Sequence, residues 1–397
     1  MANTKPTYIS LFSGCGGFDV GFKQAGYKCL GAFDINALAL ENLASNTKSP
    51  TFQVDLGSST LKNTGYKNGK PDVILSGSPC QGFSTIGKRK YEDPRNTLLV
   101  SAARIAVEIM PNVFISENVS GVMSGKHKNY WNKAKTLLKR AGYQTEEMIL
   151  NSNFYGVPQN RKRVFLIAYK AKAKHNFNIP QINGGTLRQA LKDIKGLNNH
   201  IEDFLESNSQ DEIISSKIQP GQKLSNVRGG QRSVHTWHIP EVFGKVTKQE
   251  KKLLEEVLYL RRRLRVRDFG DADPVPTKVL RSNYPKKVID SLIKKNYLKK
   301  IGECVDLVGG FNGKYRRLDY DKPSYTVDTR FGSPKHFLHP QLNRGFTVRE
   351  AARIQGFPDS YSFVGPINDQ FRMIGNAVPP PLSNILGKYI KEHLIGK

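Results

Sequence analysis

The chain has 397 residues, a length that fits one large domain with an insertion or two domains. Its 61 Lys and Arg residues against 34 Asp and Glu give a formal net charge of +27, which is typical of proteins that bind a polyanion, nucleic acid first among them. The alternative explanations of this charge are a generally basic surface or binding to an anionic membrane. The sequence has no apolar run long enough for a membrane span, no lipidation signal and no secretory signal, so we expect an intracellular protein.

Four cysteines are spread along the chain without C-x-x-C or Cys/His ligand spacing. The sequence therefore predicts neither a disulfide framework nor a zinc site, and no metal. Cys15, Cys29 and Cys304 are interpreted as small buried or half-buried side chains. Cys80 differs from them because it lies between Pro79 and Gln81.

Short apolar runs alternate with amphipathic patterns over the first 170 residues. The runs that predict strands cover residues 7–12, 29–35, 51–56, 72–77, 112–119 and 163–169, and those that predict helices cover 18–26, 36–46, 96–110 and 130–142. This alternation is typical of an α/β, doubly wound parallel sheet with helices on both faces. Ligands of such sheets bind outside the carboxyl ends of the strands.

The stretch SLFSGCGGFDVGF ends the first predicted strand and opens the first helix. Gly14, Gly16 and Gly17 allow a sharp turn and close approach of a ligand, but Asp19 stands where a dinucleotide fingerprint has its third glycine, which disfavours a standard NAD loop. Asp34 ends the second strand and could bind ribose hydroxyls, and Asp55 ends the third and could meet an adenine amine. Singly, each acid could equally cap a helix or a turn; together they indicate an adenosyl pocket.

Cys80 follows the fourth predicted strand, in SGSPCQGFS. If the strand order reverses between the first and fourth strands, this thiol faces the glycine loop. A free thiol is only a few per cent ionised at neutral pH, so a nucleophile here needs cationic or amide-dipole help. Glu117 ends the fifth strand and could lie across the same crevice, or could be an ordinary strand-end acid.

Two further stretches carry polar groups in unusual patterns. Arg161 and Arg163 alternate as the chain enters the next strand and so share a face, where they could hold a base carbonyl or a phosphate. Near the end of the chain, Gly375 and Asn376 precede a proline triplet in RMIGNAVPPPLSNIL, which predicts a tight turn before a closing helix.

From about residue 184 the composition changes, and the sequence becomes rich in Gly, Asn, Gln and Ser. Residues 245–300 contain 17 Lys and Arg against 7 Asp and Glu. Thr247 and Glu250 predict a capping box that opens a helix. Its predicted apolar positions are Leu253, Leu254, Val257, Leu258 and Leu264. Residues 277–308 then predict a short helix, a second helix with Val288, Leu292 and Ile293 inward, and a strand pair. A winged helix-turn-helix and an ordinary charged helical hairpin both fit this pattern.

Taken in order, these stretches resemble the cytosine-5 DNA methyltransferase family, through F-x-G-x-G-G, P-C-Q, E-N-V, Q-x-R-x-R, R-E-x-A-R-x-Q-G-F-P and G-N-x-V-P. The resemblance covers roughly residues 7–183 and 310–397. It implies a Rossmann-like S-adenosylmethionine-dependent domain over 1–183, completed by 371–397. A variable target-recognition domain over 184–345, with the winged-helix-like segment at 245–308, and a linker over 346–370 would follow. Ser78 departs from the family, which usually has a second proline there, but we expect activity to survive.

The resemblance also assigns roles, residue by residue. Cys80 matches the nucleophile that adds to carbon 6 of cytosine, Glu117 the acid that holds ring nitrogen 3 and the exocyclic amine, and Arg161 and Arg163 the pair that orients the base and the thiolate. The positions expected to bind S-adenosylmethionine are Phe12, Gly14, Gly16, Gly17, Asp34, Ile35, Asp55, Leu56, Pro79, Leu98 and Asn376. Those expected to bind the substrate base are Gln81, Ser84 and Val119.

The expected partner is double-stranded DNA, with the target cytosine swung out of the helix by a cytoplasmic, nucleoid-associated monomer. Restriction-modification methyltransferases of this kind have a cognate restriction endonuclease that acts on the same site. Two rival functions stay open: a tRNA cytosine methyltransferase, which would have a shorter recognition region, and a DNA-binding regulator without turnover, against which the intact Cys80, Glu117 and Arg163 argue.

Overall fold

The computed structural model describes residues 5–58, 61, 66–79, 93–171, 174–268 and 270–395. They form two compact units, one made of Met1–Ile201, Asp321–Arg330 and Thr347–Lys397, the other of Glu202–Tyr320 and Phe331–Phe346. The boundaries expected from sequence placed 184–201 and 321–330 with the recognition domain and left 346–370 as a linker. In the structure 184–201, 321–330 and 347–370 belong to the first unit; for example, the Asn199 side-chain amide donates to the Phe363 carbonyl at 2.8 Å.

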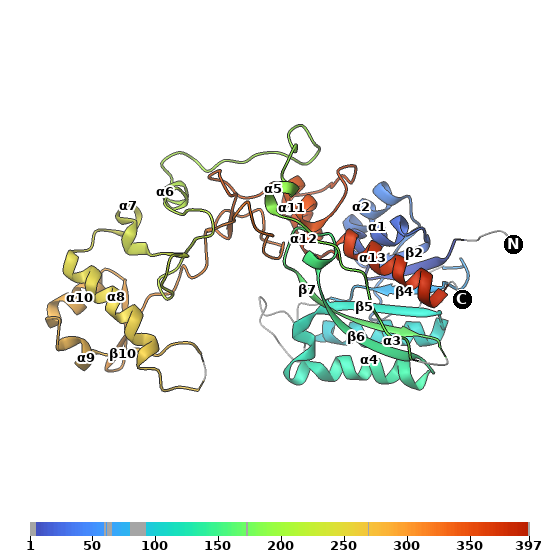
Figure 1. The fold of residues 1–397 in the computed structure, drawn as a ribbon, viewed down its shortest axis with the longest axis horizontal. Helices are drawn as coiled ribbons and strands as arrows, with labels where there is room; N and C mark the ends of the chain where they lie inside the picture. The colour runs from blue at the N-terminus through green and yellow to red at the C-terminus, as the bar shows by residue number, and fades with distance from the viewer. Residues whose placement is uncertain are drawn as a thin grey trace. The chain divides into compact units, whose positions relative to one another are not determined.

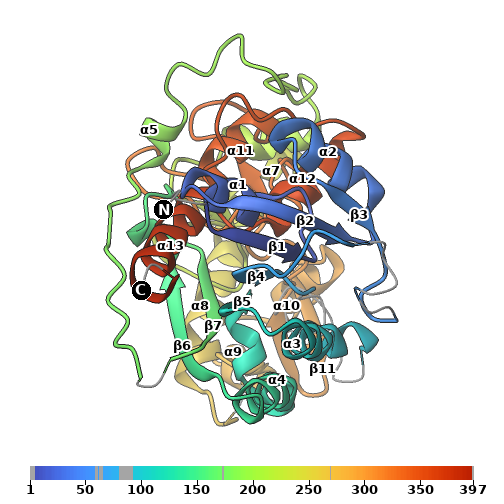
Figure 2. The same cartoon turned by 90° about the vertical axis from the view of Figure 1, so that its right-hand side faces the viewer.

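A seven-stranded sheet forms the centre of the first unit, in the order β3-β2-β1-β4-β5-β7-β6 (Figure 2). Its strands are β1 (Thr7–Leu11), β2 (Lys28–Asp34), β3 (Thr51–Gln53), β4 (Val73–Ser76), β5 (Val113–Val119), β6 (Gln144–Asn151) and β7 (Lys162–Tyr169). β1 pairs in parallel with both β2 and β4, so the strand order reverses at β1. This reversal opens the carboxyl edge of the sheet to a ligand.

Helices cover both faces of this sheet (Figures 1 and 2). The helices of the first unit are α1 (Gly17–Gln24), α2 (Ala37–Thr47), α3 (Leu98–Ile109), α4 (Lys128–Arg140), α5 (Leu187–Ala190), α11 (Val348–Gln355), α12 (Ile367–Asn376) and α13 (Pro380–Ile390). Successive residues of a strand point to opposite faces, and so Tyr8 joins a core with Phe22 and Leu382, whereas Ile9 joins a second core with Leu99 and Trp131. The predicted α/β fold with helices on both faces is confirmed.

Two features of the sheet differ from the sequence-based expectation. β6 was not predicted, because its sequence QTEEMILN is polar over its first half and, as the edge strand, it is mostly half-buried. β7 runs antiparallel to both β5 and β6, whereas a fully parallel sheet was expected. The short connection from β6 to β7, through the 3-10 turn Ser152–Phe154, reverses the chain without a crossover helix.

The C-terminal helix α13 packs directly on α1. A Cβ atom at Gly21 would lie 2.4 Å from the Pro380 carbonyl oxygen, so only glycine allows this approach. The Ser383 hydroxyl donates to the Phe18 carbonyl at 2.6 Å. The end of the chain therefore completes the core that β1 and α1 begin.

The second unit contains mostly short elements. Its helices are α6 (Gln210–Ser216), α7 (Pro240–Phe243), α8 (Lys248–Arg263), α9 (Thr277–Arg281) and α10 (Lys286–Lys294), and its strands are β8 (Lys223–Leu224), β9 (Ser233–Val234), β10 (Val275–Pro276), β11 (Leu298–Ile301), β12 (Cys304–Leu307), β13 (Arg316–Arg317) and β14 (Phe337–Leu338). The Thr247–Glu250 capping box is confirmed. Leu264, predicted as an apolar position of this helix, instead follows its last residue and is 38% exposed. No helix among the described residues is long and apolar enough to cross a membrane.

Candidate active site

The glycine loop after β1 is fastened to the end of β2 by Asp34. The Asp34 carboxylate accepts the Gly14 N–H at 2.8 Å and the Asn36 N–H at 2.9 Å. Burial raises the pKa of Asp34, and these two hydrogen bonds oppose the rise. Phe12 and Gly14 both have a φ of 53°, and a Cβ atom at Gly14 would meet nothing within 4 Å. The loop thus presents an open side next to a half-buried carboxylate.

The other two loop glycines have packing roles. A Cβ atom at Gly16 would lie 2.8 Å from Leu43, and one at Gly17 would lie 2.3 Å from the Val378 carbonyl oxygen. Both glycines therefore permit close approach of neighbouring segments rather than of a ligand. Gly17 packs against the segment that directly follows Asn376, which is itself exposed.

The Asp55 side chain stabilises the turn that follows it. One carboxylate oxygen accepts the Gly57 N–H at 2.8 Å and the other the Ser58 hydroxyl at 3.0 Å. A Cβ atom at Gly57 would lie 3.0 Å from Leu98, so Leu98 lies beside this turn. Of the two hydrophobic neighbours expected in the pocket, Ile35 is 66% exposed and Leu56 is buried in the core.

Cys80, Gln81 and Ser84 lie outside the described residues, which include Ser78 and Pro79. The chain leading to Cys80 is held to β5 by Asn118, whose side-chain amide donates to the carbonyl and to the hydroxyl oxygen of Ser78, both at 3.2 Å. A proline at position 78, which the resemblance noted above would lead us to expect, would have no hydroxyl for this contact. Asn118 was not predicted as a site residue, although it is the central letter of the E-N-V motif.

Glu117 and Arg163 form a nearly buried ion pair, with Arg163 Nε 2.9 Å from Glu117 Oε1. The register explains the contact: Glu117 is opposite Phe165 and Val119 opposite Arg163, so the acid and the arginine are diagonal neighbours on one face of the sheet. Burial raises the pKa of Glu117, and the charges of Arg163 and Arg161 oppose the rise. Glu117 and Arg163, each predicted separately as a site residue, thus meet at the carboxyl end of β5, with Val119 beside them.

Arg161 is in a different environment from Arg163. Its side chain is buried, and its guanidinium donates to the carbonyl oxygens of Val327, Gly375 and Ala377, each at 3.0 Å. The two arginines were expected to act as a pair on one face. In the structure Arg161 instead binds the backbone carbonyls on either side of Asn376, whereas Arg163 pairs with Glu117.

Gln159 and Gln355 belong to the same hydrogen-bond network as Arg161, and neither was predicted as a site residue. The Gln159 amide donates to Gln355 Oε1 at 2.5 Å and accepts the Val327 N–H at 3.0 Å. Gln355 donates to the Ala377 carbonyl at 2.5 Å. Both glutamines lie within sequence motifs given above, so the motifs marked their positions. Motif spacing alone, however, does not indicate which groups they contact.

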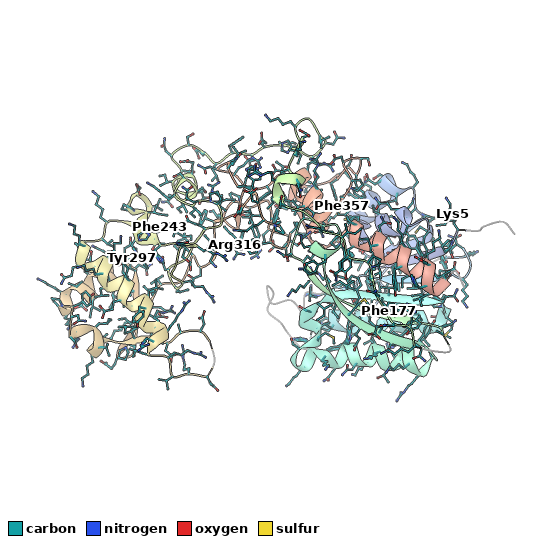
Figure 3. The ribbon with its side chains drawn as sticks, in the orientation of Figure 1. Lys5, Phe177, Phe243, Tyr297, Arg316 and Phe357 are labelled. Atoms are coloured by element: carbon teal, nitrogen blue, oxygen red, sulfur yellow. The ribbon has the colours of Figure 1, made fainter. Side chains whose placement is uncertain are left out.

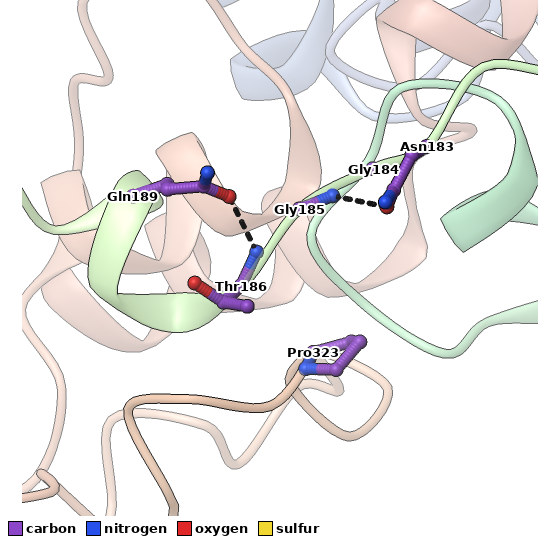
Figure 4. Close-up of a pocket in the computed structure, with 6 residues that line it drawn as sticks. All are labelled: Asn183, Gly184, Gly185, Thr186, Gln189 and Pro323. Atoms are coloured by element: carbon purple, nitrogen blue, oxygen red, sulfur yellow. Dashed lines mark hydrogen bonds between the residues drawn. The ribbon is translucent and has the colours of Figure 1, made fainter.

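A surface pocket of about 530 Å³ in the first unit involves none of the predicted site residues (Figure 4). It is lined by Asn183, Gly184, Gly185, Thr186, Gln189 and Pro323. Its polar groups pair with one another, since Gly185 N–H donates to Asn183 and Thr186 N–H to Gln189, both at 2.9 Å. This pocket has no charged lining residue and supports no catalytic role. The described residues also contain no cluster of three or more His, Cys, Asp or Glu side chains that could hold a metal.

Comparison with known proteins decides the family. The family model for C-5 cytosine-specific DNA methylases matches residues 7–392. The chain belongs to this family. The resemblance in the sequence motifs is thereby confirmed, and the methylase is a C-5 cytosine DNA methyltransferase.

Relatives match the methylase over nearly its whole length. It is 32% identical to the Type II methyltransferase M.DdeI of Desulfomicrobium norvegicum, over 96% of this chain and 88% of that protein. It is also 32% identical to the Type II methyltransferase M.NlaIV of Neisseria lactamica, over 98% of each. A solved E. coli structure, described as a prophage-encoded DNA modification methyltransferase, is 24% identical with a TM-score of 0.61 over 99% of this chain and 100% of that one. The last likeness supports the fold.

Proposed function

We propose that the methylase transfers a methyl group from S-adenosylmethionine to carbon 5 of a cytosine swung out of double-stranded DNA, through a covalent bond to Cys80. The observation that carries the proposal is the buried pair of Glu117 and Arg163, 2.9 Å apart, at the carboxyl end of β5. β5 neighbours β4, whose following loop leads through Ser78 and Pro79 to Cys80. Carboxyl, guanidinium and thiol are the groups that activation of a cytosine ring requires.

The chemistry explains why a thiol is needed. Carbon 5 of cytosine is a weak nucleophile, and addition of the Cys80 thiolate to carbon 6 raises electron density at carbon 5, which divides one difficult step into two. Glu117 holds the ring at nitrogen 3 and the exocyclic amine and stabilises the adduct, and Arg163 fixes the orientation of Glu117. After carbon 5 takes the methyl group, loss of its proton to a base and departure of the thiolate restore the aromatic ring and the enzyme.

The residues at the carboxyl edge of β1 and β2 fit S-adenosylmethionine. The open side of Gly14 leaves room for a ligand, and the Asp34 carboxylate beside it can accept hydrogen bonds from ribose hydroxyls. Phe12, Ile35, Asp55, Leu98, Pro79 and Asn376 are the further residues proposed to hold it. When bound, this cofactor supplies the methyl group.

Two features support a DNA duplex as substrate. The net charge of +27 matches a polyanion, and the family acts on DNA. Flipping the target nucleotide costs a few kcal/mol, which contacts in the base pocket must offset. The Type II methyltransferases among the relatives support a restriction-modification role, with a nuclease that acts on the same site.

Substitution of Cys80 tests the covalent step. Cys80→Ser should reduce methyl transfer below detection, because an alcohol is not ionised at neutral pH, while DNA affinity stays within a few-fold of the unsubstituted protein. Transfer is measured with labelled S-adenosylmethionine, and bisulfite sequencing of DNA from an expressing host reports the methylated cytosine. Substantial turnover by the serine variant would exclude the covalent route.

Mechanism-based trapping gives an independent readout. Duplexes with 5-fluorocytosine at the target lack the proton that must leave, so the unsubstituted protein should accumulate a stable conjugate. Mass spectrometry should place the conjugate at position 80, with Cys80→Ser as the matched control. A conjugate at another residue, or none, contradicts the assignment.

A further inference from the structure

The second unit contains a compact set of elements whose order is α8, β10, α9, α10, β11 and β12. β11 and β12 form an antiparallel hairpin with a two-residue turn at Gly302 and Glu303, and β10 pairs on the other edge of β12, giving the sheet order β10-β12-β11. α9 and α10 are joined by the four residues 282–285, the length found in helix-turn-helix units. A charged helical hairpin, the alternative left open by the sequence, does not account for the third strand.

We infer that residues 248–307 form a winged helix in which α10 reads the base sequence of the DNA and the β11–β12 hairpin binds its phosphates. This inference rests on the proposed function and goes beyond it, because it names the element that selects the site.

The set has its own core, so α10 is held firmly. Buried side chains from every element meet there, among them Leu254 of α8, Leu280 of α9, Leu292 of α10 and Val305 of β12. Tyr297, between α10 and β11, donates from its hydroxyl to the Phe243 and Gly244 carbonyls at 3.0 and 2.9 Å, and Figure 3 labels Tyr297 and Phe243. A reading helix needs such support, because misplacement by a fraction of an ångström weakens base contacts.

Glu250 locks α8 to α10. Its carboxylate accepts the Ser291 hydroxyl at 2.7 Å and the Lys295 ammonium at 2.8 Å. Burial by itself would raise the pKa of Glu250, but hydrogen bonds from Lys295, Thr247 and Ser291 outweigh it and lower the pKa to about 2. Lys295 is thereby engaged within the protein and is not counted among the DNA contacts.

The outer surface of these elements is strongly basic. Residues 277–301 contain eight Lys or Arg and one acid, Asp290. Of these basic residues, Lys295 alone is paired with a carboxylate within the described part of the chain, and the other seven are exposed. Exposed cations on α9, on α10 and on the adjacent hairpin match the backbone of a duplex.

The exposed face of α10 carries Lys287, Asp290 and Lys294, three and four residues apart and therefore on one side of the helix. In helix-turn-helix proteins the first residues of the second helix reach base edges in the major groove. Lys287 can donate to guanine O6 and N7, and Asp290 can accept the cytosine N4 amine. Asp290 would be repelled by phosphates, so its place within this basic face is explained by a contact with bases.

The hairpin is tested through the salt dependence of DNA affinity. Lys299 and Lys300 are exposed on β11, and Lys299→Gln/Lys300→Gln removes two phosphate contacts. The slope of log affinity against log salt should become shallower by about 1.8, on cognate and unrelated duplexes alike. The control Lys133→Gln/Lys139→Gln removes two exposed charges from α4 in the first unit and should leave the slope unchanged. Equal slopes for the two double variants would overturn the phosphate assignment.

Site selection by α10 is tested with Asp290→Ala. Methylation of a randomised duplex library, read by bisulfite sequencing, should show relaxed discrimination at one base pair of the site, on the order of 10- to 100-fold. Discrimination at the other positions of the site should be retained. Asp268→Ala, at an exposed acid outside α10, is the matched control. An unchanged pattern for Asp290→Ala and for Lys287→Ala would overturn the reading role.

Failure of this inference is distinguishable from failure of the proposed function. If the unsubstituted protein methylates no cytosine in the library, the proposed function is wrong. If it methylates a defined site and the α10 variants methylate the same site with the same discrimination, only the winged-helix reading is wrong.

Discussion

Asp34 and Asp72 show how the same side chain serves different purposes at the two ends of the parallel strands. Asp72 precedes β4 and accepts the Thr7 N–H at 2.8 Å and the Thr7 hydroxyl at 2.9 Å, which ties β4 to the start of β1. Asp34 ends β2 and holds the glycine loop instead. Ligands bind at the carboxyl edge, so Asp34 alone is placed to contact one.

Substitution of these two acids should separate ligand binding from strand attachment. Asp34→Ala should weaken S-adenosylmethionine about 10- to 100-fold, because hydrogen bonds to a charged group contribute roughly 1.5–3 kcal/mol, and should weaken DNA binding less. Asp72→Ala should lower the free energy of unfolding with cofactor affinity unchanged. Titration calorimetry and urea unfolding measure the two quantities. Unchanged cofactor affinity in Asp34→Ala would remove the ribose assignment.

Between elements, Arg161 joins parts of the first unit that are far apart in sequence. It enters β7 and holds the carbonyls of Val327, Gly375 and Ala377, so the end of α12 depends on it. Lysine has a single ammonium and cannot present the planar fork of donors that serves three carbonyls. At Arg163 the partner is one carboxylate, to which lysine can still offer its charge.

Lysine substitutions at the two arginines should therefore affect different properties, chiefly stability at Arg161 and chiefly activity at Arg163. Arg161→Lys should lower the free energy of unfolding by about 2–4 kcal/mol, since buried acceptors lose their donors. Arg163→Lys should change it by less than about 1 kcal/mol and still lower kcat/KM at least about tenfold through misplacement of Glu117. Urea unfolding and steady-state methylation of both variants provide the comparison. Equal loss of stability in the two variants would contradict the separation of roles.

These elements also show what could be read from the sequence and what could not. Alternating apolar runs predicted β1 to β5, because a buried parallel strand needs a continuous apolar segment. β6 was missed, since an edge strand can be polar over half its length. Spacing placed Arg161 and Arg163 on one face but could not separate them, because the carbonyls that bury Arg161 come from segments more than 160 residues away. Asn118 and Gln159 were quoted within motifs, yet their contacts depend on tertiary packing.

At the scale of the whole chain, each of the two compact units contains one of the two tryptophans of the sequence. Trp131 is buried in the first unit, where its indole donates to Glu147 at 2.5 Å. Trp237 is buried in the second, stacked on His235 with ring centroids 4.4 Å apart. Each unit has its own hydrophobic core, and multi-domain chains commonly unfold in more than one transition. Tryptophan fluorescence can therefore follow each unit separately.

Cofactor binding should stabilise only the unit that Trp131 reports. In Trp237→Phe, S-adenosylhomocysteine at about 100 times its Kd should add roughly 2.7 kcal/mol to the first unit, which raises the midpoint of the Trp131 transition by about 5–10 °C for a unit of this size. In Trp131→Phe, the Trp237 transition should move by less than about 1 °C under the same conditions. Each substitution lies in the unit that its variant does not report, so the reporting core stays intact. Equal shifts in the two variants would mean that the chain unfolds as one cooperative body and that the cofactor's free energy is shared by both units.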